Sequence, residues 1–316
     1  MVIFMGNNGK IDNSIDNLRK LYQQEYGVAV FDIKIKEVKK GIELEGRVLT
    51  RSQRDDIIDA LRENKENVIK DNIKILADAN ERNEIGWAVV KSISIDLRSR
   101  FVSNEVINKK ILKRVRCSQA FKNEILRILY KNEDQLLVQQ NDLTLGWINR
   151  REVVMKRKSL YKKWKSGNFA LKNKTIKVNK KLKDILIKEA EKYIGVGYVL
   201  GGKSRKGIDC SGLIQIAYKN SLGVILPKHS WDQKEVGKKI KLKDVRTGDL
   251  VFLIKKSNKY KHVGIVERKS ESLAETLTWR NISLIHASLD KKKVVEQDSD
   301  KVFEKYDFVE ARRIVE

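Results

Sequence analysis

The stretch YVLGGKSRKGIDCSGLIQIAY, residues 198–218, carries the most information about the last third of this chain. A glycine-rich loop leads to Cys210, and the apolar segment that follows, 211–219, is typical of a helix. A helix N-terminus carries partial positive charge and free N–H groups, which lower the pKa of a thiol and bind a developing oxyanion. We therefore expect Cys210 to be a nucleophile with a lowered pKa; the alternative is a small buried core residue.

A thiolate nucleophile needs a general base beside it, and histidine usually fills that role. The chain contains three histidines. His262 lies in KHVGIV and His286 in SLIHAS, and both stretches have the composition of strands. We expect His262 to act as base and acid, with His286 orienting its ring. We interpret His229 as a surface residue and Cys117 as a small buried one.

The pattern of residues 182–316 is helix, loop, helix and then strands. An amphipathic helix is predicted over 182–195, ended by Gly195. Strands are predicted at 249–254, 261–267, 283–289 and 310–316. Several different short motifs follow one another along this region. In chain order they are Gly201-Gly202, Asp209-Cys210-Ser211-Gly212, Gly223 with Leu226-Pro227, Ser230 and Gln233, Gly248 to Phe252, His262 to Ile265, and Ile285 to Ser288.

In these motifs, residues 182–316 resemble the NlpC family of cell-wall cysteine peptidases. The resemblance implies a papain-like α+β domain, in which the cysteine helix packs against an antiparallel sheet, with no metal or organic cofactor. It implies that Cys210 is the nucleophile, that His262 is the base, and that His286 is the third member of the triad.

The same resemblance bears on the substrate pocket. Tyr198, Asp209 and Ser211 fall on family positions that line the site, where Asp209 and Ser211 would help to hold a free amino terminus or polar substrate groups. Leu200 stands where the family usually has an aromatic residue, and the connection at 267–281 is longer than the usual turn. We expect that connection to form a lid or a short helix.

Residues 1–80 predict a small α+β domain that resembles a BON-like domain. Its expected elements are a helix at 14–25, strands at 28–38 and 42–49, a helix at 51–63 capped by Ser52, and a strand at 67–76.

Residues 84–155 predict a small all-β domain, with short alternating segments at 87–97, 124–130, 135–140 and 145–153. Leu136-Leu137-Val138 and Gly146-Trp147 make this region resemble the closing strands of a bacterial SH3-like domain. Members of the NlpC family often carry such domains before the peptidase. We therefore expect an SH3-like barrel here, followed by a basic linker over 156–181.

The formal net charge is +25, and residues 151–183 hold 13 Lys or Arg against one acidic residue. Interleaved Tyr161, Trp164 and Phe169 suggest contact with a polyanion, for which an anionic wall polymer is the candidate; nucleic acid is not the partner that we expect. The alternatives are a solvated linker, or aromatic side chains that pack on a neighbouring domain.

Two cysteines are too few for a disulfide framework or, with three histidines, for a Cys-His metal cluster. No stretch approaches the length of a membrane span, and the first residues lack a signal-peptide pattern. The expectation is a cytoplasmic protein; the alternative is a secreted or wall-associated protein whose export signal was removed.

The function that these observations predict is hydrolysis of γ-D-glutamyl bonds in peptidoglycan stem peptides through a Cys-His-His triad and a thioester, as in γ-D-glutamyl-L-diamino acid endopeptidases and dipeptidyl-peptidases. An amidase or acyltransferase with the same triad is one alternative. A wall- or polyanion-binding protein is the other.

Overall fold

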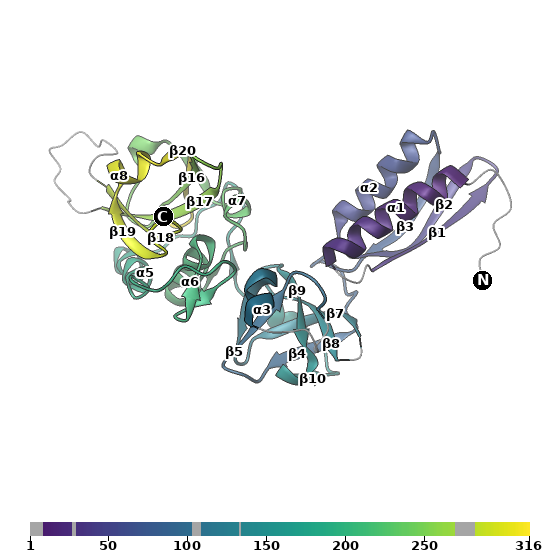
Figure 1. The fold of residues 1–316 in the computed structure, drawn as a ribbon, viewed down its shortest axis with the longest axis horizontal. Coiled ribbons are helices and arrows are strands. Elements are labelled where there is room, and N and C mark those ends of the chain that lie inside the picture. Colours follow the sequence, from purple (N-terminus) through teal and green to yellow (C-terminus); the bar gives the residue numbers. More distant parts are fainter. Residues whose placement is uncertain (1–8, 27–29, 103–108, 133, 269–281) are drawn as a thin grey trace. The chain divides into compact units, whose positions relative to one another are not determined.

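The computed structural model describes residues 9–26, 30–102, 109–132, 134–268 and 282–316 (Figure 1). The chain divides into two compact units. The first unit comprises Met1–Arg116 and Ala120–Lys165, and the second comprises Cys117–Gln119 and Ser166–Glu316. Within the described residues, no helix is long and apolar enough to cross a membrane.

The N-terminal part of the first unit is a small α+β layer structure. Its elements are α1 (Gly9–Tyr26), β1 (Phe31–Val38), β2 (Gly41–Val48), α2 (Arg51–Glu63) and β3 (Val68–Ile75). β1 pairs antiparallel with β2, and β2 pairs parallel with β3. Alternate apolar residues of the strands meet the helices in one core that includes Leu44, Ile57 and Leu61. The predicted order of elements is confirmed.

The predicted cap of α2 is wrong by two residues. Thr50, not Ser52, is the N-cap: its side chain accepts a hydrogen bond from the N–H of Gln53 (3.3 Å), and Gln53 Oε1 accepts one from the N–H of Thr50 (3.1 Å). This reciprocal capping box uses two N–H groups that a helix start leaves free, whereas Ser52 already lies inside the helix.

The rest of the first unit is mainly β. Its elements are β4 (Gly86–Val90), β5 (Ser94–Arg98), α3 (Lys109–Val115), β6 (Arg116–Phe121, whose residues Cys117–Gln119 are assigned to the second unit), β7 (Ile125–Lys131), β8 (Gln135–Gln139), β9 (Leu145–Asn149), η1 (Arg150–Glu152), β10 (Val153–Lys156) and α4 (Tyr161–Trp164). The strands form one sheet in the order β10-β4-β7-β8-β9-β5-β6. The segments predicted at 124–130 and 135–140 are confirmed as the strands β7 and β8. The segment 87–97 divides into β4 and β5, and 145–153 contains β9 and η1, while α3, β6, β10 and α4 were not predicted.

Two of the aromatic residues in the basic segment 151–183 pack inside the first unit. Trp164 is buried, its ring lies 6.0 Å from that of Trp87, and its Nε1 donates to the carbonyl of Gln139 (3.2 Å). The hydroxyl of Tyr161 donates to the carbonyl of Ala79 (2.9 Å). These contacts fit the alternative in which the aromatic residues pack on a neighbouring domain rather than stack on a polymer.

The second unit contains two long helices, α5 and α6, with short strands around them, followed by the strands of a larger sheet. Its elements are β11 (Asn168–Phe169), α5 (Lys180–Glu191), β12 (Lys203–Ser204), β13 (Gly207–Ile208), α6 (Cys210–Leu222), β14 (Val224–Ile225), α7 (Ser230–Gln233), β15 (Lys238–Ile240), η2 (Leu242–Asp244), β16 (Leu250–Lys255), β17 (Lys261–Arg268), β18 (Ile282–Ser288), β19 (Lys293–Asp298), α8 (Ser299–Phe303) and β20 (Tyr306–Arg313).

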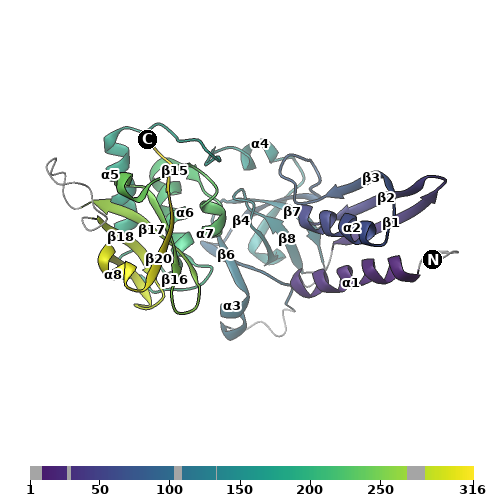
Figure 2. The same cartoon turned by 90° about the horizontal axis from the view of Figure 1, so that it is seen from above.

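Six of these strands form an antiparallel sheet in the order β15-β20-β16-β17-β18-β19. Helix α6 packs against β17, β18 and α5, and Figures 1 and 2 both show α5 and α6 on the same side of the sheet. The expected arrangement of a cysteine helix on an antiparallel sheet is therefore confirmed.

Three details of this region differ from expectation. Helix α5 ends at Glu191 with Lys192 as its C-cap, so Gly195 lies beyond the helix in the following loop. Strands β15 and β19 were not predicted, and the last strand, expected at 310–316, is β20 at Tyr306–Arg313. The lid or helix expected at 267–281 falls almost wholly outside the described residues, which stop at Arg268 and resume at Ile282.

Candidate active site

Cys210 is the first residue of α6, and Asp209 fixes the position of this helix start. One carboxylate oxygen of Asp209 accepts hydrogen bonds from the N–H of Gly212 (2.7 Å) and from the hydroxyl of Ser211 (3.1 Å). The other accepts from the N–H of Gly201 in the preceding loop (2.7 Å). One buried side chain therefore caps the helix and holds the loop before it.

Glycine at 212 is required by a close approach of two backbones. A Cβ at this position would lie 2.3 Å from the carbonyl oxygen of Gly202. The loop and the first turn of α6 can therefore pack this closely only without a side chain there. Behind them, Gln233 is fully buried and its Nε2 donates to the carbonyls of Ser211 (3.1 Å) and Pro227 (2.9 Å).

Cys210 is buried at the start of a helix that packs on the sheet. The side chain is 4% exposed. The backbone N–H groups of Val263, Ser211 and Cys210 itself act to lower the pKa of the thiol. Helix α6 packs against β17, so the strand that carries His262 lies beside the helix that carries Cys210.

The expected lowering of the thiol pKa is not what the structure shows. Burial, reinforced by the nearby charge of Asp209, raises the pKa of the Cys210 thiol to about 12. The three backbone N–H groups act in the opposite direction but do not outweigh the loss of solvent. Cys210 is therefore a neutral thiol at neutral pH in the resting site.

The two predicted histidines form a buried pair. Nε2 of His262, on β17, lies 2.8 Å from Nδ1 of His286, on β18, and the rings meet edge to face at 77°. His262 is fully buried and His286 is 2% exposed. Within the described parts of the chain, Nδ1 of His262 has no hydrogen-bond partner. If Nε2 of His262 donates to His286, this Nδ1 is the free lone pair that a general base needs.

Both imidazoles are neutral near neutral pH. Burial, and then repulsion from His286 and Lys255, hold the pKa of His262 well below its usual value. Burial also lowers the pKa of His286 to about 4, although Gln297 and Asp290 act in the opposite direction. A histidine of this site therefore gains its proton during the reaction, and does not take it up from the solvent beforehand.

The predicted substrate-binding residues surround the cysteine. Tyr198 lies in the loop before β12, and its hydroxyl is 2.7 Å from that of Tyr260. Asp209 and Ser211 flank Cys210, but the Asp209 carboxylate already accepts the three hydrogen bonds described above, so contact with a substrate remains a prediction. Leu200 is 60% exposed, so a small apolar surface stands where the family usually has an aromatic ring.

Two tyrosines at the site were not predicted. Tyr260, two residues before His262, lies with its hydroxyl 2.7 Å from that of Tyr198. Tyr306, at the start of β20, packs its ring against that of His262, with centroids 5.1 Å apart and planes at 31°. The spacing of two residues between Tyr260 and His262 could have indicated that Tyr260 lies near the site. Tyr306 belongs to a strand distant in the sequence, and no motif in the sequence marks it.

The remaining cysteine and histidine lie elsewhere. Cys117 is half-buried in β6, so the expectation of a buried residue is wrong. His229 is exposed, as expected, beside the ammonium group of Lys228. In the described ranges, no three His, Cys, Asp or Glu side chains are grouped so that they could hold a metal ion.

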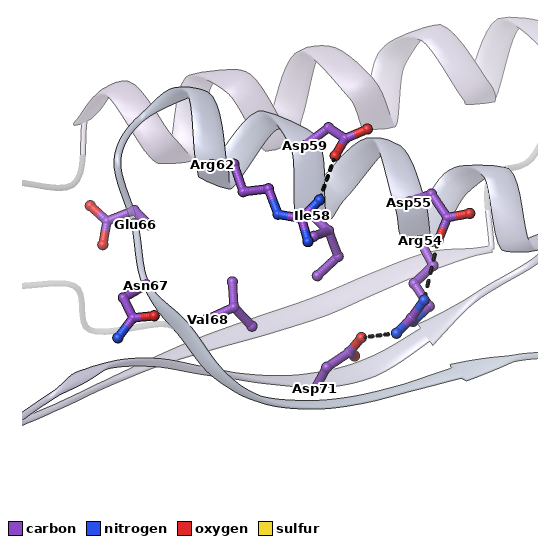
Figure 3. Close-up of a pocket in the computed structure, with 9 residues that line it drawn as sticks. All are labelled: Arg54, Asp55, Ile58, Asp59, Arg62, Glu66, Asn67, Val68 and Asp71. Carbon is purple, nitrogen blue, oxygen red and sulfur yellow. Dashed lines mark hydrogen bonds and ion pairs between the residues drawn. The ribbon is translucent and has the colours of Figure 1, made fainter.

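A pocket of about 640 Å³ lies on the first unit, away from these residues (Figure 3). It is lined by Arg54, Asp55, Ile58, Asp59, Arg62, Glu66, Asn67, Val68 and Asp71. Figure 3 shows its arginines already paired: Arg54 bridges Asp55 (3.2 Å) and Asp71 (2.6 Å), and Arg62 meets Asp59 (3.1 Å). These internal pairs involve every charged side chain that lines the pocket except Glu66.

Comparison with known proteins places the second unit in a family. Residues 195–313 match the NlpC/P60 family. The chain is 44% identical over 85 residues to the gamma-DL-glutamyl hydrolase of Bacillus subtilis (strain 168), covering 25% of this chain and 20% of that protein. It is 33% identical over 121 residues to murein DD-endopeptidase MepS/murein LD-carboxypeptidase of Escherichia coli (strain K12), covering 38% and 57%.

A third relative is matched over most of its length. The chain is 30% identical over 127 residues to the probable endopeptidase NlpC of Escherichia coli (strain K12), covering 40% of this chain and 74% of that protein. A buried cysteine at a helix start and a histidine pair on an antiparallel sheet have the geometry of a cysteine hydrolase. Together with these matches they show that the chain belongs to the NlpC/P60 family. The chain spans 20% of the length of the gamma-DL-glutamyl hydrolase and 57% of the length of the murein DD-endopeptidase.

Proposed function

We propose that this protein is a cysteine peptidase that hydrolyses γ-D-glutamyl bonds in peptidoglycan stem peptides, with Cys210, His262 and His286 as its catalytic residues. The observation that carries the proposal is the position of Cys210. It is the first residue of α6, which packs against β17, while the His262–His286 bond of 2.8 Å fixes the base on that strand.

The proposed reaction begins with a neutral thiol and a neutral imidazole. As Cys210 Sγ attacks the carbonyl carbon of the scissile bond, its proton passes to Nδ1 of His262. His262 then gives this proton to the leaving amine, the C–N bond breaks and a thioester remains. Water, deprotonated by His262, attacks the thioester, and the thiol is regenerated with release of the acid.

The histidine pair and the backbone donors have complementary roles in this reaction. The imidazolium formed on His262 is stabilised by its bond to His286, which offsets part of the cost of a buried charge. The N–H groups at the start of α6 point at the reacting centre and supply donors for the oxyanion. In enzymes, loss of one such donor slows the chemical step by about 10²–10³-fold.

The choice of bond rests on the sequence motifs and on one relative. The match to a gamma-DL-glutamyl hydrolase supports a γ-glutamyl bond, whereas the murein relative is named for DD-endopeptidase and LD-carboxypeptidase activities. An amidase or acyltransferase would use the same three residues. Mass analysis of the products from a panel of murein fragments distinguishes these reactions.

The upstream regions are proposed to serve the same substrate. The sheet formed by β4 to β10 would be the SH3-like domain that often precedes such peptidases and shapes their pocket. An anionic wall polymer, if bound at 151–183, would meet its lysines and arginines, because Trp164 is buried. A requirement for a free amino terminus would indicate that the enzyme acts on liberated peptides inside the cell.

The first experiment is digestion of defined stem peptides, with free and with blocked amino termini, by the full chain and its variants. Cys210→Ala and His262→Ala should each abolish release of the N-terminal dipeptide. Cys117→Ala and His229→Ala are matched controls of the same residue types, distant in the sequence or exposed, and should cleave like the wild type. Undiminished release by Cys210→Ala would refute the proposal.

A further inference from the structure

Tyr306, the first residue of β20, lies on the same face of the sheet as His262. Strand β16 runs between β20 and β17, and its Leu253 pairs with His262 while its Lys255 pairs with Tyr306. Because side chains alternate between the two faces of a strand, Leu253 and Lys255 point to one face, and so do their partners. The register of the sheet therefore brings the tyrosine ring towards the imidazole across β16.

The two rings are in contact and roughly stacked. Their centroids lie 5.1 Å apart and their planes meet at 31°. This separation falls within the range of about 4.5–7 Å over which aromatic rings interact. His286 meets the same imidazole edge to face, at 4.9 Å and 77°. The His262 ring is therefore held by a tyrosine ring as well as by the bond from its Nε2 to His286.

The bond to His286 fixes one nitrogen of His262 but not the plane of the ring. The χ2 torsion of histidine is broad, so the imidazole turns easily unless something packs on it. Nδ1, the atom proposed to take the thiol proton, makes no hydrogen bond within the described residues, so no bond at that atom restrains the ring. A stacked ring resists the turn, because a turn drives the imidazole into the tyrosine or opens a gap in a close-packed core.

Tyr306 can act as a fixed support because it belongs to the core of the second unit. It is 3% exposed and packs in a cluster that includes Val251, Leu253 and Leu284. Its buried hydroxyl has no hydrogen-bond partner among the described residues. The packing of the ring, rather than a bond of the hydroxyl, therefore holds this side chain.

We propose that Tyr306 is a positioning residue, whose ring holds the imidazole of His262 in the orientation from which Nδ1 acts as the base. The inference rests on the proposed function of Cys210 and His262. When His262 takes the thiol proton, its positive charge faces the tyrosine ring, and an aromatic ring attracts a cation within about 6 Å of its centroid. Tyr306 therefore supports the base both before and after proton transfer.

Two substitutions at Tyr306 separate the ring from the hydroxyl. Tyr306→Leu removes the ring and should lower kcat for the stem peptide by about tenfold with little change in KM, because the lost contact is with the base and not with substrate. Tyr306→Phe keeps the ring and should restore most of the wild-type kcat. Urea denaturation of each variant gives the folded fraction for which kcat is corrected.

Phe303→Leu is the matched control for the loss of a packed ring. Phe303 packs against the same core cluster as Tyr306, and its ring lies 6.5 Å from that of Phe308. This variant should lose stability, as Tyr306→Leu does, but should keep the kcat of the wild type.

Nitrogen NMR of histidine-labelled protein provides a readout that needs no substrate. The chain has three histidines, and comparison with His262→Gln and His229→Ala assigns their ring signals. In the wild type and in Tyr306→Phe, the two ring nitrogens of His262 should show the separate shifts of a single neutral tautomer. In Tyr306→Leu, these shifts should move towards each other, because a ring that turns away from His286 exchanges between tautomers.

Three results would overturn the inference. Equal losses of kcat in Tyr306→Leu and Tyr306→Phe would assign the effect to the hydroxyl. Equal losses in Tyr306→Leu and Phe303→Leu, or unchanged His262 shifts in Tyr306→Leu, would reduce Tyr306 to a core residue. If the wild type fails to cleave the stem peptide while the His262 shifts change as expected, the proposed function fails and the positioning of His262 by Tyr306 is supported.

Discussion

The two units each contain a buried polar cluster, and the clusters differ in the partners of the atoms that lack a hydrogen bond. In the first unit, the fully buried guanidinium of Arg127 donates to the carbonyls of Asp78 (2.8 Å) and Glu81 (2.6 Å) and to Gln139 Oε1 (3.1 Å). Its Nε makes no hydrogen bond within the described residues, but it forms an ion pair with the carboxylate of Glu84 at 3.5 Å.

The cluster in the second unit is left incomplete. His262 and His286 are as deeply buried as Arg127 and are bonded to each other, yet Nδ1 of His262 has no hydrogen bond within the described residues. A buried polar atom without a partner costs free energy, so proteins retain few of them. The comparison teaches that the cluster completed by a buried ion pair stabilises the fold, whereas the histidine pair keeps a nitrogen for chemistry.

The largest effect expected from this difference is on stability. Arg127→Met leaves the Glu84 carboxylate and the carbonyls of Asp78 and Glu81 buried without their partner, which should lower the free energy of unfolding by about 3–5 kcal/mol. Urea denaturation, monitored by circular dichroism, measures this change. Below the denaturation transition, the variant should still cleave stem peptides.

The matched variant is His262→Gln, which keeps a polar side chain in the other cluster. It should abolish cleavage with a smaller loss of stability, because His262 makes one hydrogen bond where Arg127 makes three. Two results would contradict this account, in which the Arg127 cluster stabilises the fold and the histidine pair serves catalysis. Arg127→Met would unfold at the same urea concentration as the wild type, or His262→Gln would be the less stable of the two variants.

A second, smaller effect depends on pH. The pKa of His286 is about 4 in the folded protein and about 6.5 when unfolded, so between these values only the unfolded state binds the proton. Stability should therefore fall as the pH drops through this window, by up to about 3 kcal/mol from His286 alone.

Denaturation curves across that window check the expectation. His286→Gln should flatten the dependence on pH, whereas Arg127→Met should lower stability by a similar amount at each pH, because arginine does not titrate there. A wild-type protein whose stability stays constant as the pH falls would show that the imidazoles are not buried in neutral form.

The sequence was sufficient for features that local patterns determine. Alternation and helical periodicity predicted the strands and helices around Cys210, and motif order brought Cys210, His262 and His286 into one prediction. All three are buried, and the two histidines are bonded to each other, while their joint role in catalysis stays a prediction. Strand β19 was missed because KKVVEQD offers few apolar residues, and its partner β18 supplies the pairing.

Features that depend on distant parts of the chain were not predictable in this way. The thiol pKa was expected to fall because the helix start is visible in the sequence, but burial by the sheet is a tertiary property and has the larger effect. The contact between Tyr198 and Tyr260 joins residues far apart in the chain. The packing of Tyr306 on His262 likewise has no local signal.

The central claim is that Cys210 forms a covalent acyl intermediate, and intact-mass spectrometry after an acid quench tests it most directly. The substrate is a γ-D-glutamyl peptide with an activated leaving group, so that the thioester accumulates. The account predicts one added acyl group, mapped by proteolysis to the peptide containing Cys210 and absent from Cys210→Ala. Product release without an adduct, or an adduct on another residue that persists in Cys210→Ala, would contradict it.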